Sequence, residues 1–325
     1  MSRSRPPSRE EILGYFSELS NWGRWGDEDE LGTLNLITPE HRRRAAALIT
    51  EGVVIPLGMD LDPGQPDPLA RGTQVLLEPI RYAMGRMTAA RERLTLTPHG
   101  SLTHLDSPAH IAWDGTVYNG WTTAEAYGPR GVTRLSVHQA RAGIVARGVL
   151  LDIAAVRGVD SLEDGDGVFP EDLLAAEERQ GIRVAEGDVL IVRTGYLTRA
   201  LRSGGNDDHY GGVGYHASAL PLLRERGVAV IASDALNDMN PSGYAFDGPA
   251  TPAAFDRLDV ETASLTVPVH AIALTAMGAW LLDHVEVEEL ALTCRRLGRW
   301  EFFLSVEPLR MVGSTGSHVN PLAIF

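Results

Sequence analysis

The chain has 325 residues, of which 44% are hydrophobic and 22% are charged, and these values exclude fibrous and disordered proteins. Its formal net charge is −14, so phosphate backbones and anionic lipid headgroups repel it, and we expect no nucleic-acid partner and no membrane partner. All 29 basic residues are arginine, which excludes Schiff-base catalysis and a P-loop because both need a lysine amine.

The N-terminal half combines one clear helix with several strands. Thr38 and Pro39 are typical of a helix cap and a first helical position, and they predict a helix over residues 40–50 that closes near Gly52. Apolar, β-branched runs predict strands over residues 53–59, 74–82 and 93–97. Between them, the proline-rich residues 60–72 predict a loop, either a lid or an inert connection.

The C-terminal half alternates strands with helices. Predicted strands cover residues 149–153, 189–194, 228–233 and 301–306, and predicted helices cover residues 136–142, 171–180, 217–226 and 287–297. This alternation predicts an α/β protein with a mixed β-sheet and flanking helices. No internal repeat is visible, so we expect a single domain over residues 1–325, with an N-terminal extension of about residues 1–37.

Signals for secretion and for membrane insertion are weak. The first ten residues are polar and no apolar segment follows them, which argues against a cleaved signal peptide. The longest apolar stretch, residues 267–282, is shorter than the roughly 20 residues of a spanning helix. The single cysteine, Cys294, excludes an intramolecular disulfide, and its amphipathic surroundings predict a buried thiol. We therefore expect a cytoplasmic protein.

A histidine-rich segment carries the strongest chemical signal. Three of the ten histidines, His99, His104 and His110, fall within twelve residues. In an extended backbone His104 and Asp106 point to the same face, and an imidazole beside a carboxylate is a ligand pair for zinc or manganese. Pro108 turns the chain, so His110 is predicted to reach back over the ion as a proton carrier. The alternative is a structural network of histidine and aspartate.

This segment resembles the signature of a known family. Residues 103–110 match the T-H-x-D-x-P-x-H part of the H-x-G-T-H-x-D-x-P-x-H signature of the putative cyclase family, which includes bacterial kynurenine formamidase and isatin hydrolase. Residues 21–35 resemble the opening of its longer members. His270, Gly278 and Asp283 resemble its distal histidine, glycine and acidic residue, and residues 313–321 resemble its terminal glycine-rich strand.

The resemblance implies a fold, a metal site and a type of partner. The fold is the swivelling β/β/α-like arrangement of that family. His104, Asp106 and His270 are implied as ligands of one divalent ion, Zn or Mn, and Asp283 as a further ligand or as a residue that orients one. His110 is implied as the general acid and base, and Trp25 as a substrate-binding residue. We expect a small-molecule substrate and a homodimer or homotetramer.

One position departs from the family pattern. The family's first histidine falls on Gly100, which has no side chain to ligate a metal. His99, one residue earlier, is a candidate to replace it, either as a ligand or as a residue that orients one. Strand alternation nevertheless predicts that His99 faces away from His104, unless a bulge at Gly100 redirects the backbone.

The predicted activity is hydrolysis by metal-activated water. We expect the chain to open a carbon–nitrogen amide bond, in a cyclic amide or an aryl formamide, or a related lactone. Two alternatives stay open: a polyketide-type cyclase or dehydratase that uses the same metal site, and a catalytically silent binding homologue. Gly212 and Gly214 imitate a dinucleotide fingerprint, but the polar residues before them predict no strand leading into it.

Overall fold

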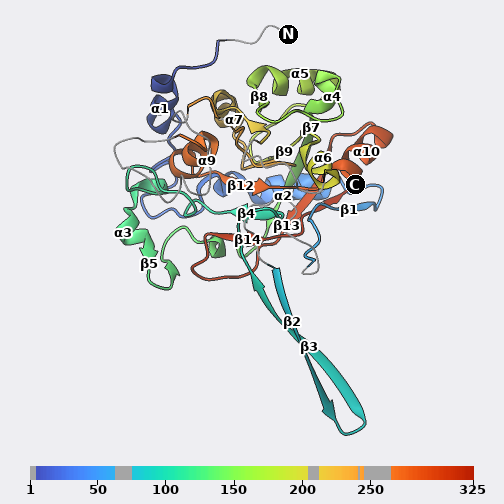
Figure 1. The fold of residues 1–325 in the computed structure, drawn as a ribbon. Helices are drawn as coiled ribbons and strands as arrows, with labels where there is room; N and C mark the ends of the chain where they lie inside the picture. The colour runs from blue at the N-terminus through green and yellow to red at the C-terminus, as the bar shows by residue number, and fades with distance from the viewer. Residues whose placement is uncertain (1–4, 63–74, 204–211, 241, 245–264) are drawn as a thin grey trace.

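A mixed β-sheet forms the centre of the molecule (Figure 1). The computed structural model describes residues 5–62, 75–203, 212–240, 242–244 and 265–325. The largest sheet has nine strands, in the spatial order β1 (Val54–Pro56), β15 (Leu322–Ile324), β13 (Glu301–Val306), β7 (Ile144–Asp152), β9 (Val189–Arg193), β11 (Val230–Ser233), β12 (Trp280–Asp283), β4 (His104–Asp106) and β14 (Gly316–His318). The neighbouring strands β7, β9, β11 and β12 are parallel, and the other pairs are antiparallel.

Helices cover both faces of this sheet. Val149 and Leu151 of β7 are buried in one core with helices α5 (Pro170–Gln180), α7 (Leu220–Arg226) and α9 (Pro268–Ile272), whereas Leu150 is buried in the other core with α10 (Glu288–Leu297). Because both faces of the central strands are buried, the strands are continuous apolar runs in the sequence. The remaining α-helices are α1 (Arg9–Glu18), α2 (Pro39–Ala46), α3 (Thr123–Ala126), α4 (Ile153–Arg157) and α6 (Tyr196–Arg202).

Short helical turns and two-residue strands complete the body. The turns are η1 (Gly32–Leu36), η2 (Tyr118–Gly120), η3 (Val137–Ala140), η4 (Ala217–Ala219) and the π-helical η5 (Ala273–Met277). The short strands are β5 (Tyr127–Gly128), which pairs with β6 (Gly131–Val132), and β8 (Gly167–Val168), which pairs with β10 (Gly214–Tyr215). Among the described residues, no helix is long and apolar enough to cross a membrane.

The α/β class and the mixed sheet predicted from the sequence are confirmed. One predicted helix is wrong: residues 136–142 form only the 3-10 turn η3, and Gly143, with a φ of 80°, stops any continuation of the helix beyond them. Most of the predicted loop, residues 63–72, lies outside the described residues. Within the predicted N-terminal extension, Ile12 and Leu19 are buried in the same core as α9.

A long hairpin projects from the layered body (Figure 1). It consists of β2 (Val75–Met84) and β3 (Met87–Leu96), which pair with each other as a separate two-stranded sheet. Every residue of both strands is at least partly exposed. The last residue of β3 precedes His99 by only two intervening residues, so the base of the hairpin adjoins the histidine-rich segment.

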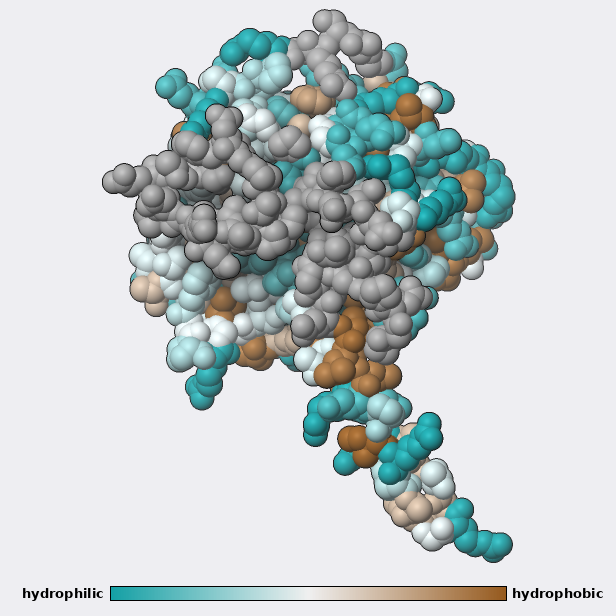
Figure 2. Space-filling model, in the orientation of Figure 1, coloured by the Kyte–Doolittle hydropathy of each residue, from teal (hydrophilic) through white to brown (hydrophobic). Residues whose placement is uncertain are grey.

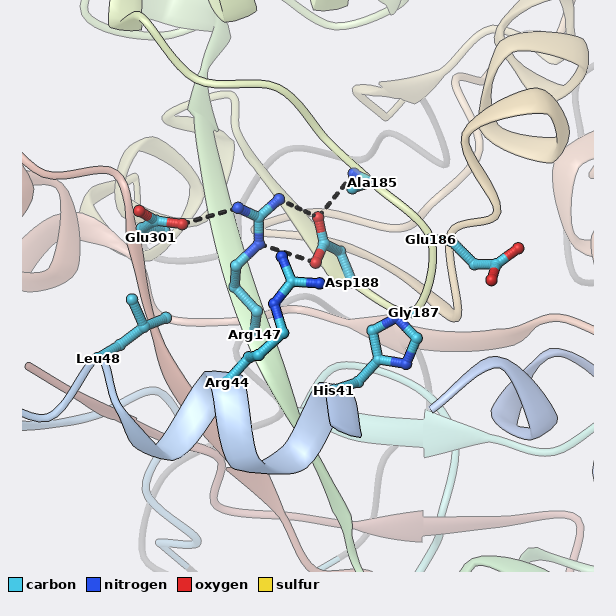
Figure 3. A pocket seen from close by; sticks show the side chains of 9 residues that line it. All are labelled: His41, Arg44, Leu48, Arg147, Ala185, Glu186, Gly187, Asp188 and Glu301. Carbon is cyan, nitrogen blue, oxygen red and sulfur yellow. Dashed lines mark hydrogen bonds and ion pairs between the residues drawn. The ribbon is translucent and has the colours of Figure 1, made fainter. Parts of the chain in front are cut away.

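A surface pocket of about 350 Å³ lies beside β7, and Arg147 at its wall is paired with two carboxylates (Figure 3). Arg147 donates two hydrogen bonds to the carboxylate of Asp188, of 2.9 and 2.6 Å, and one of 2.7 Å to Glu301. These bonds join β7 to β13 and to the loop before β9. We therefore interpret this pocket as part of the framework of the sheet.

Candidate metal centre

Strand β4 presents His104 and Asp106 on one face, as the sequence predicts. The strand has three residues and lies between β12 and β14, and the intervening Leu105 is buried in the core on the opposite face. Asp283, the last residue of β12, is the antiparallel neighbour of His104. Two carboxylates and one imidazole therefore meet on the same face of the sheet.

Helix α9 brings His270 to this face. The Nε2 atom of His270 is 3.2 Å from Oδ2 of Asp283 and 3.6 Å from Oδ2 of Asp106. The Nε2 atom of His104 is 3.6 Å from Oδ1 of Asp106 and 3.6 Å from Oδ2 of Asp283. All four side chains are buried. The structure thus brings together the three predicted ligands and Asp283.

Hydrogen bonds at the Nδ1 atoms fix the orientation of both histidines. Nδ1 of His104 donates to the carbonyl oxygen of Leu102 at 2.7 Å, and Nδ1 of His270 donates to the carboxylate of Asp238 at 2.6 Å. Both Nε2 atoms therefore point at carboxylate oxygens, which are acceptors. Each Nε2 must either carry a proton or share a cation with those oxygens.

The charges of the cluster also favour a cation. Oδ2 of Asp106 is buried and has no hydrogen-bond donor among the described residues. Burial alone would lower the pKa of His270, but the carboxylates of Asp283, Asp106 and Asp238 hold that pKa well above its usual value. Buried carboxylate oxygens and imidazole nitrogens are the ligands that Zn and Mn prefer. The residues present therefore fit a divalent ion.

His110 lies beside this cluster, at the position that the turn at Pro108 predicts. Its backbone N–H donates to the carbonyl of Ser107, and its Nε2 is 3.9 Å from Oδ2 of Asp106. Withdrawal from water lowers the pKa of His110 to about 4, although the charge of Asp106 opposes this shift. The ring is therefore neutral at pH 7.

The prediction that His99 faces away from His104 is wrong. Nδ1 of His99 is 2.7 Å from Oδ1 of Asp106, and its ring stacks on that of His110 with a centroid distance of 3.9 Å. Strand alternation does not hold here because residues 97–103 are not in a strand, and Gly100 adopts a φ of 118°. Gly316 leaves room for the ring, since a Cβ at that position would lie 2.5 Å from Cε1 of His99.

Several residues of the cluster were missed by the sequence analysis. Asp238 is fully buried and accepts hydrogen bonds from the backbone N–H groups of Val269 and His270. Asn237 donates to Oδ1 of Asp283 through its backbone and its side chain. Thr315 contacts Nε2 of His99 at 2.8 Å. Two signals were available: the polar pair Asn237 and Asp238 follows the buried strand β11, and Thr315 lies in the glycine-rich segment that resembles the family's terminal strand.

Other singled-out residues lie in ordinary structural settings. The ring of Trp25 is half-buried under the guanidinium of Arg24 at 4.8 Å, and its role in substrate binding stays a prediction. Cys294 is buried in α10, and burial raises the pKa of its thiol to about 12. Asp234, the residue after β11, accepts hydrogen bonds from the backbone N–H groups of Thr194 and Gly195 just before α6.

Comparisons with known proteins agree with this architecture. A family model described as "Putative cyclase" matches residues 34–237, more than half of the chain. A crystal structure of a novel cyclase superposes with a TM-score of 0.80 at 27% sequence identity, covering 95% of this chain and 100% of that chain. A search of the curated proteins found no match.

Two structures of isatin hydrolase A share the fold at lower identity. The protein from Labrenzia aggregata, bound to benzyl benzoate, is 18% identical, with a TM-score of 0.56 over 86% of this chain and 94% of that chain. The protein from Ralstonia solanacearum is 20% identical, with a TM-score of 0.55 over 83% of this chain and 91% of that chain.

Proposed function

This chain belongs to the putative cyclase family, and on that premise we propose that it is a metal-dependent hydrolase of small molecules. Its reaction would open a carbon–nitrogen amide bond, in a cyclic amide or an aryl formamide, or a related lactone. The observation that carries the proposal is the pair of histidines held at Nδ1, whose Nε2 atoms both face Asp106 and Asp283. The isatin hydrolases support the proposal through their shared fold.

We infer that His104, Asp106 and His270 hold one divalent ion, Zn or Mn. Asp283 either joins them or orients them, because one of its oxygens faces both Nε2 atoms and the other accepts two hydrogen bonds from Asn237. When bound, such an ion supplies Lewis acidity toward a carbonyl oxygen and toward water. The remaining steps belong to the side chains of the protein.

His110 is the proposed proton carrier. Its neutral imidazole accepts the proton of the attacking water and returns it to the leaving nitrogen or oxygen. The ring of His99 lies flat against that of His110, with an interplanar angle of 15°, and so restrains its orientation. His99 itself is held between Asp106 and Thr315. We propose that His99 orients Asp106 and His110.

The same site also supports a cyclase or dehydratase that consumes no water, and labelled water separates the two reactions. The alternative of a catalytically silent binding homologue rests on Gly100, which stands where the family has a histidine that could ligate the metal. His99 places an imidazole 2.7 Å from Asp106, so that motivation is weakened.

The first test is the metal content and its link to turnover. We expect protein purified without chelators to contain about one divalent ion per chain, and to hydrolyse a member of a panel of cyclic amides, aryl formamides and lactones. Exhaustive chelation should abolish turnover, and zinc or manganese should restore it. Full turnover after exhaustive chelation would contradict the proposal. Incorporation of ¹⁸O from labelled water into the product is expected for hydrolysis and not for cyclisation.

A further inference from the structure

The hydroxyl of Thr315 lies where it can control the imidazole of His99. Its Oγ1 atom is 2.8 Å from Nε2 of His99, while Nδ1 of the same ring is 2.7 Å from Oδ1 of Asp106. Within the part of the chain that the structure describes, His99 is the hydroxyl's only hydrogen-bond partner. One ring therefore bridges Thr315 and Asp106, and the two contacts use both of its nitrogens.

These two contacts determine which ring nitrogen carries the proton. An ionised carboxylate accepts hydrogen bonds and donates none, so the contact with Asp106 needs a proton on Nδ1 of His99. In a neutral imidazole the other nitrogen is then an acceptor, and a threonine hydroxyl can donate to it. The hydroxyl of Thr315 thus disfavours the other tautomer, in which Nδ1 and Oδ1 would face each other as two acceptors.

The backbone of Thr315 is anchored to the strand that carries Asp106. The carbonyl oxygen of Thr315 accepts hydrogen bonds from the backbone N–H and the hydroxyl of Ser107, each of 2.9 Å. The next residue, Gly316, is the strand partner of Asp106. The sheet therefore holds the hydroxyl and the carboxylate on either side of the imidazole, at a spacing that one ring fills.

His99 depends on these contacts because it lies outside the sheet. The chain reaches it from the β2–β3 hairpin, whose strands form a separate two-stranded sheet. Figure 2 shows this hairpin standing away from the rest of the molecular surface. Residues 97–103 are in no strand, and the side chain of His99 is partly exposed. Strand pairing therefore does not hold the ring, and its side-chain contacts must do so.

We propose that Thr315 is a positioning residue of the candidate metal centre and acts through His99. The inference rests on the proposed function, because it assigns a role within the same site. The hydroxyl keeps the proton of His99 on Nδ1, so that Oδ1 of Asp106 is occupied. Oδ2 of Asp106, which is buried and has no donor among the described residues, is then left for the ion. The same contact fixes the plane of the ring that stacks on His110.

Removal and restoration of the hydroxyl test this proposal. Thr315→Val keeps the branched shape but has no hydroxyl, and it should raise the zinc dissociation constant and lower kcat by about 10-fold each, the lower end of the usual cost of losing an outer partner. Thr315→Ser keeps a hydroxyl and should stay within about twofold of the wild-type protein on both measures. Zinc titration against a chromophoric chelator and steady-state kinetics provide the two values.

The matched control is Thr116→Val. It also removes the hydroxyl of a partly buried threonine, but one that donates to the carbonyl oxygen of Trp113 at 2.9 Å. Zinc affinity and kcat of this control should not change. A Thr315→Val protein that matches the wild-type protein, or losses of equal size in Thr315→Ser or Thr116→Val, would overturn the proposal.

The tautomer of His99 gives a readout that does not depend on activity. In the zinc-loaded protein, long-range ¹H–¹⁵N NMR spectra should place the proton on Nδ1 of His99, with its signals assigned by their loss in His99→Gln. Thr315→Val should weaken this preference. A proton on Nε2 in the wild-type protein would refute the proposal and identify His99 as a ligand through Nδ1.

The failures of the two proposals are distinguishable. Wild-type protein that binds no zinc would contradict the proposed function, and this inference with it. A wild-type protein with zinc-dependent turnover, whose Thr315→Val variant is unchanged, would contradict the role of Thr315 alone.

Discussion

Asp238 acts on the candidate metal centre through His270. Its carboxylate accepts the Nδ1 proton of His270 and two backbone N–H groups at the start of α9, so it sets both the direction and the basicity of the imidazole. We expect Asp238→Asn to weaken metal affinity by about 10-fold to 100-fold, the usual cost of losing such a partner. Titration of the metal-free protein with zinc, followed by a competing chromophoric chelator, measures the change.

The matched control for this prediction is Asp234→Asn. Asp234 is also a buried aspartate beyond β11, but its oxygens accept hydrogen bonds from Thr194 and Gly195. The same chemical change at this position should leave metal affinity within about twofold. Equal losses in both variants would indicate that general destabilisation, not the orientation of His270, weakens the site.

His110 is expected to matter for turnover and not for binding of the ion. His110→Gln removes the group that accepts a proton but keeps a polar side chain beside Asp106, so kcat should fall by about 10² to 10⁴. The metal content of the variant should stay near that of the wild-type protein. Elemental analysis and steady-state kinetics on the same preparation check both parts. Loss of the ion together with activity would identify His110 as a ligand.

At the scale of elements, Asp234 links the end of β11 to the start of α6, and this link carries a pH dependence. Burial raises the pKa of Asp234 to about 6, although hydrogen bonds from Thr194 and Gly195 oppose the shift. Because the folded state then binds the proton more tightly than the unfolded state, this residue lowers stability as pH rises from about 4 to 6.

The Asp234→Asn variant isolates this effect. Relative to the variant, the wild-type protein should lose about 2 kcal/mol of unfolding free energy between pH 4.5 and 7.5. The loss accumulates between pH 4.5 and the pKa of about 6, at about 1.4 kcal/mol for each pH unit. Urea unfolding of both proteins at a series of pH values measures the difference. A difference that is constant over this range, or that grows with pH, would contradict the raised pKa.

Sequence patterns predicted some elements and site residues correctly and others not. Apolar runs predicted the central strands because burial on both faces leaves a continuous signal, and Thr38 with Pro39 marked the start of α2. Strand alternation placed His104 and Asp106 correctly but failed for His99, because residues 97–103 are not in a strand. Asp238 gave no periodic signal, since its role depends on α9, which lies far away in the sequence.

At the scale of the whole molecule, the candidate metal centre joins segments that are distant in the chain. β4 contributes His104 and Asp106, α9 contributes His270, and β12 contributes Asp283. Such a set of ligands does not exist in the unfolded chain, so the free energy of metal binding adds to the free energy of folding. The proposed ion should therefore stabilise the fold as a whole.

This linkage predicts the thermal behaviour of the protein. At a free metal concentration about 1,000-fold above the dissociation constant, binding contributes roughly 4 kcal/mol to stability. A chain of this length has an unfolding entropy of roughly 0.7 kcal/mol/K, so chelation should lower Tm by about 6 °C. Asp106→Asn removes a proposed ligand and should show no such shift, whereas His110→Gln should keep it. Calorimetry with and without chelator measures all three proteins, and a shift of equal size in Asp106→Asn would place the ion elsewhere in the molecule.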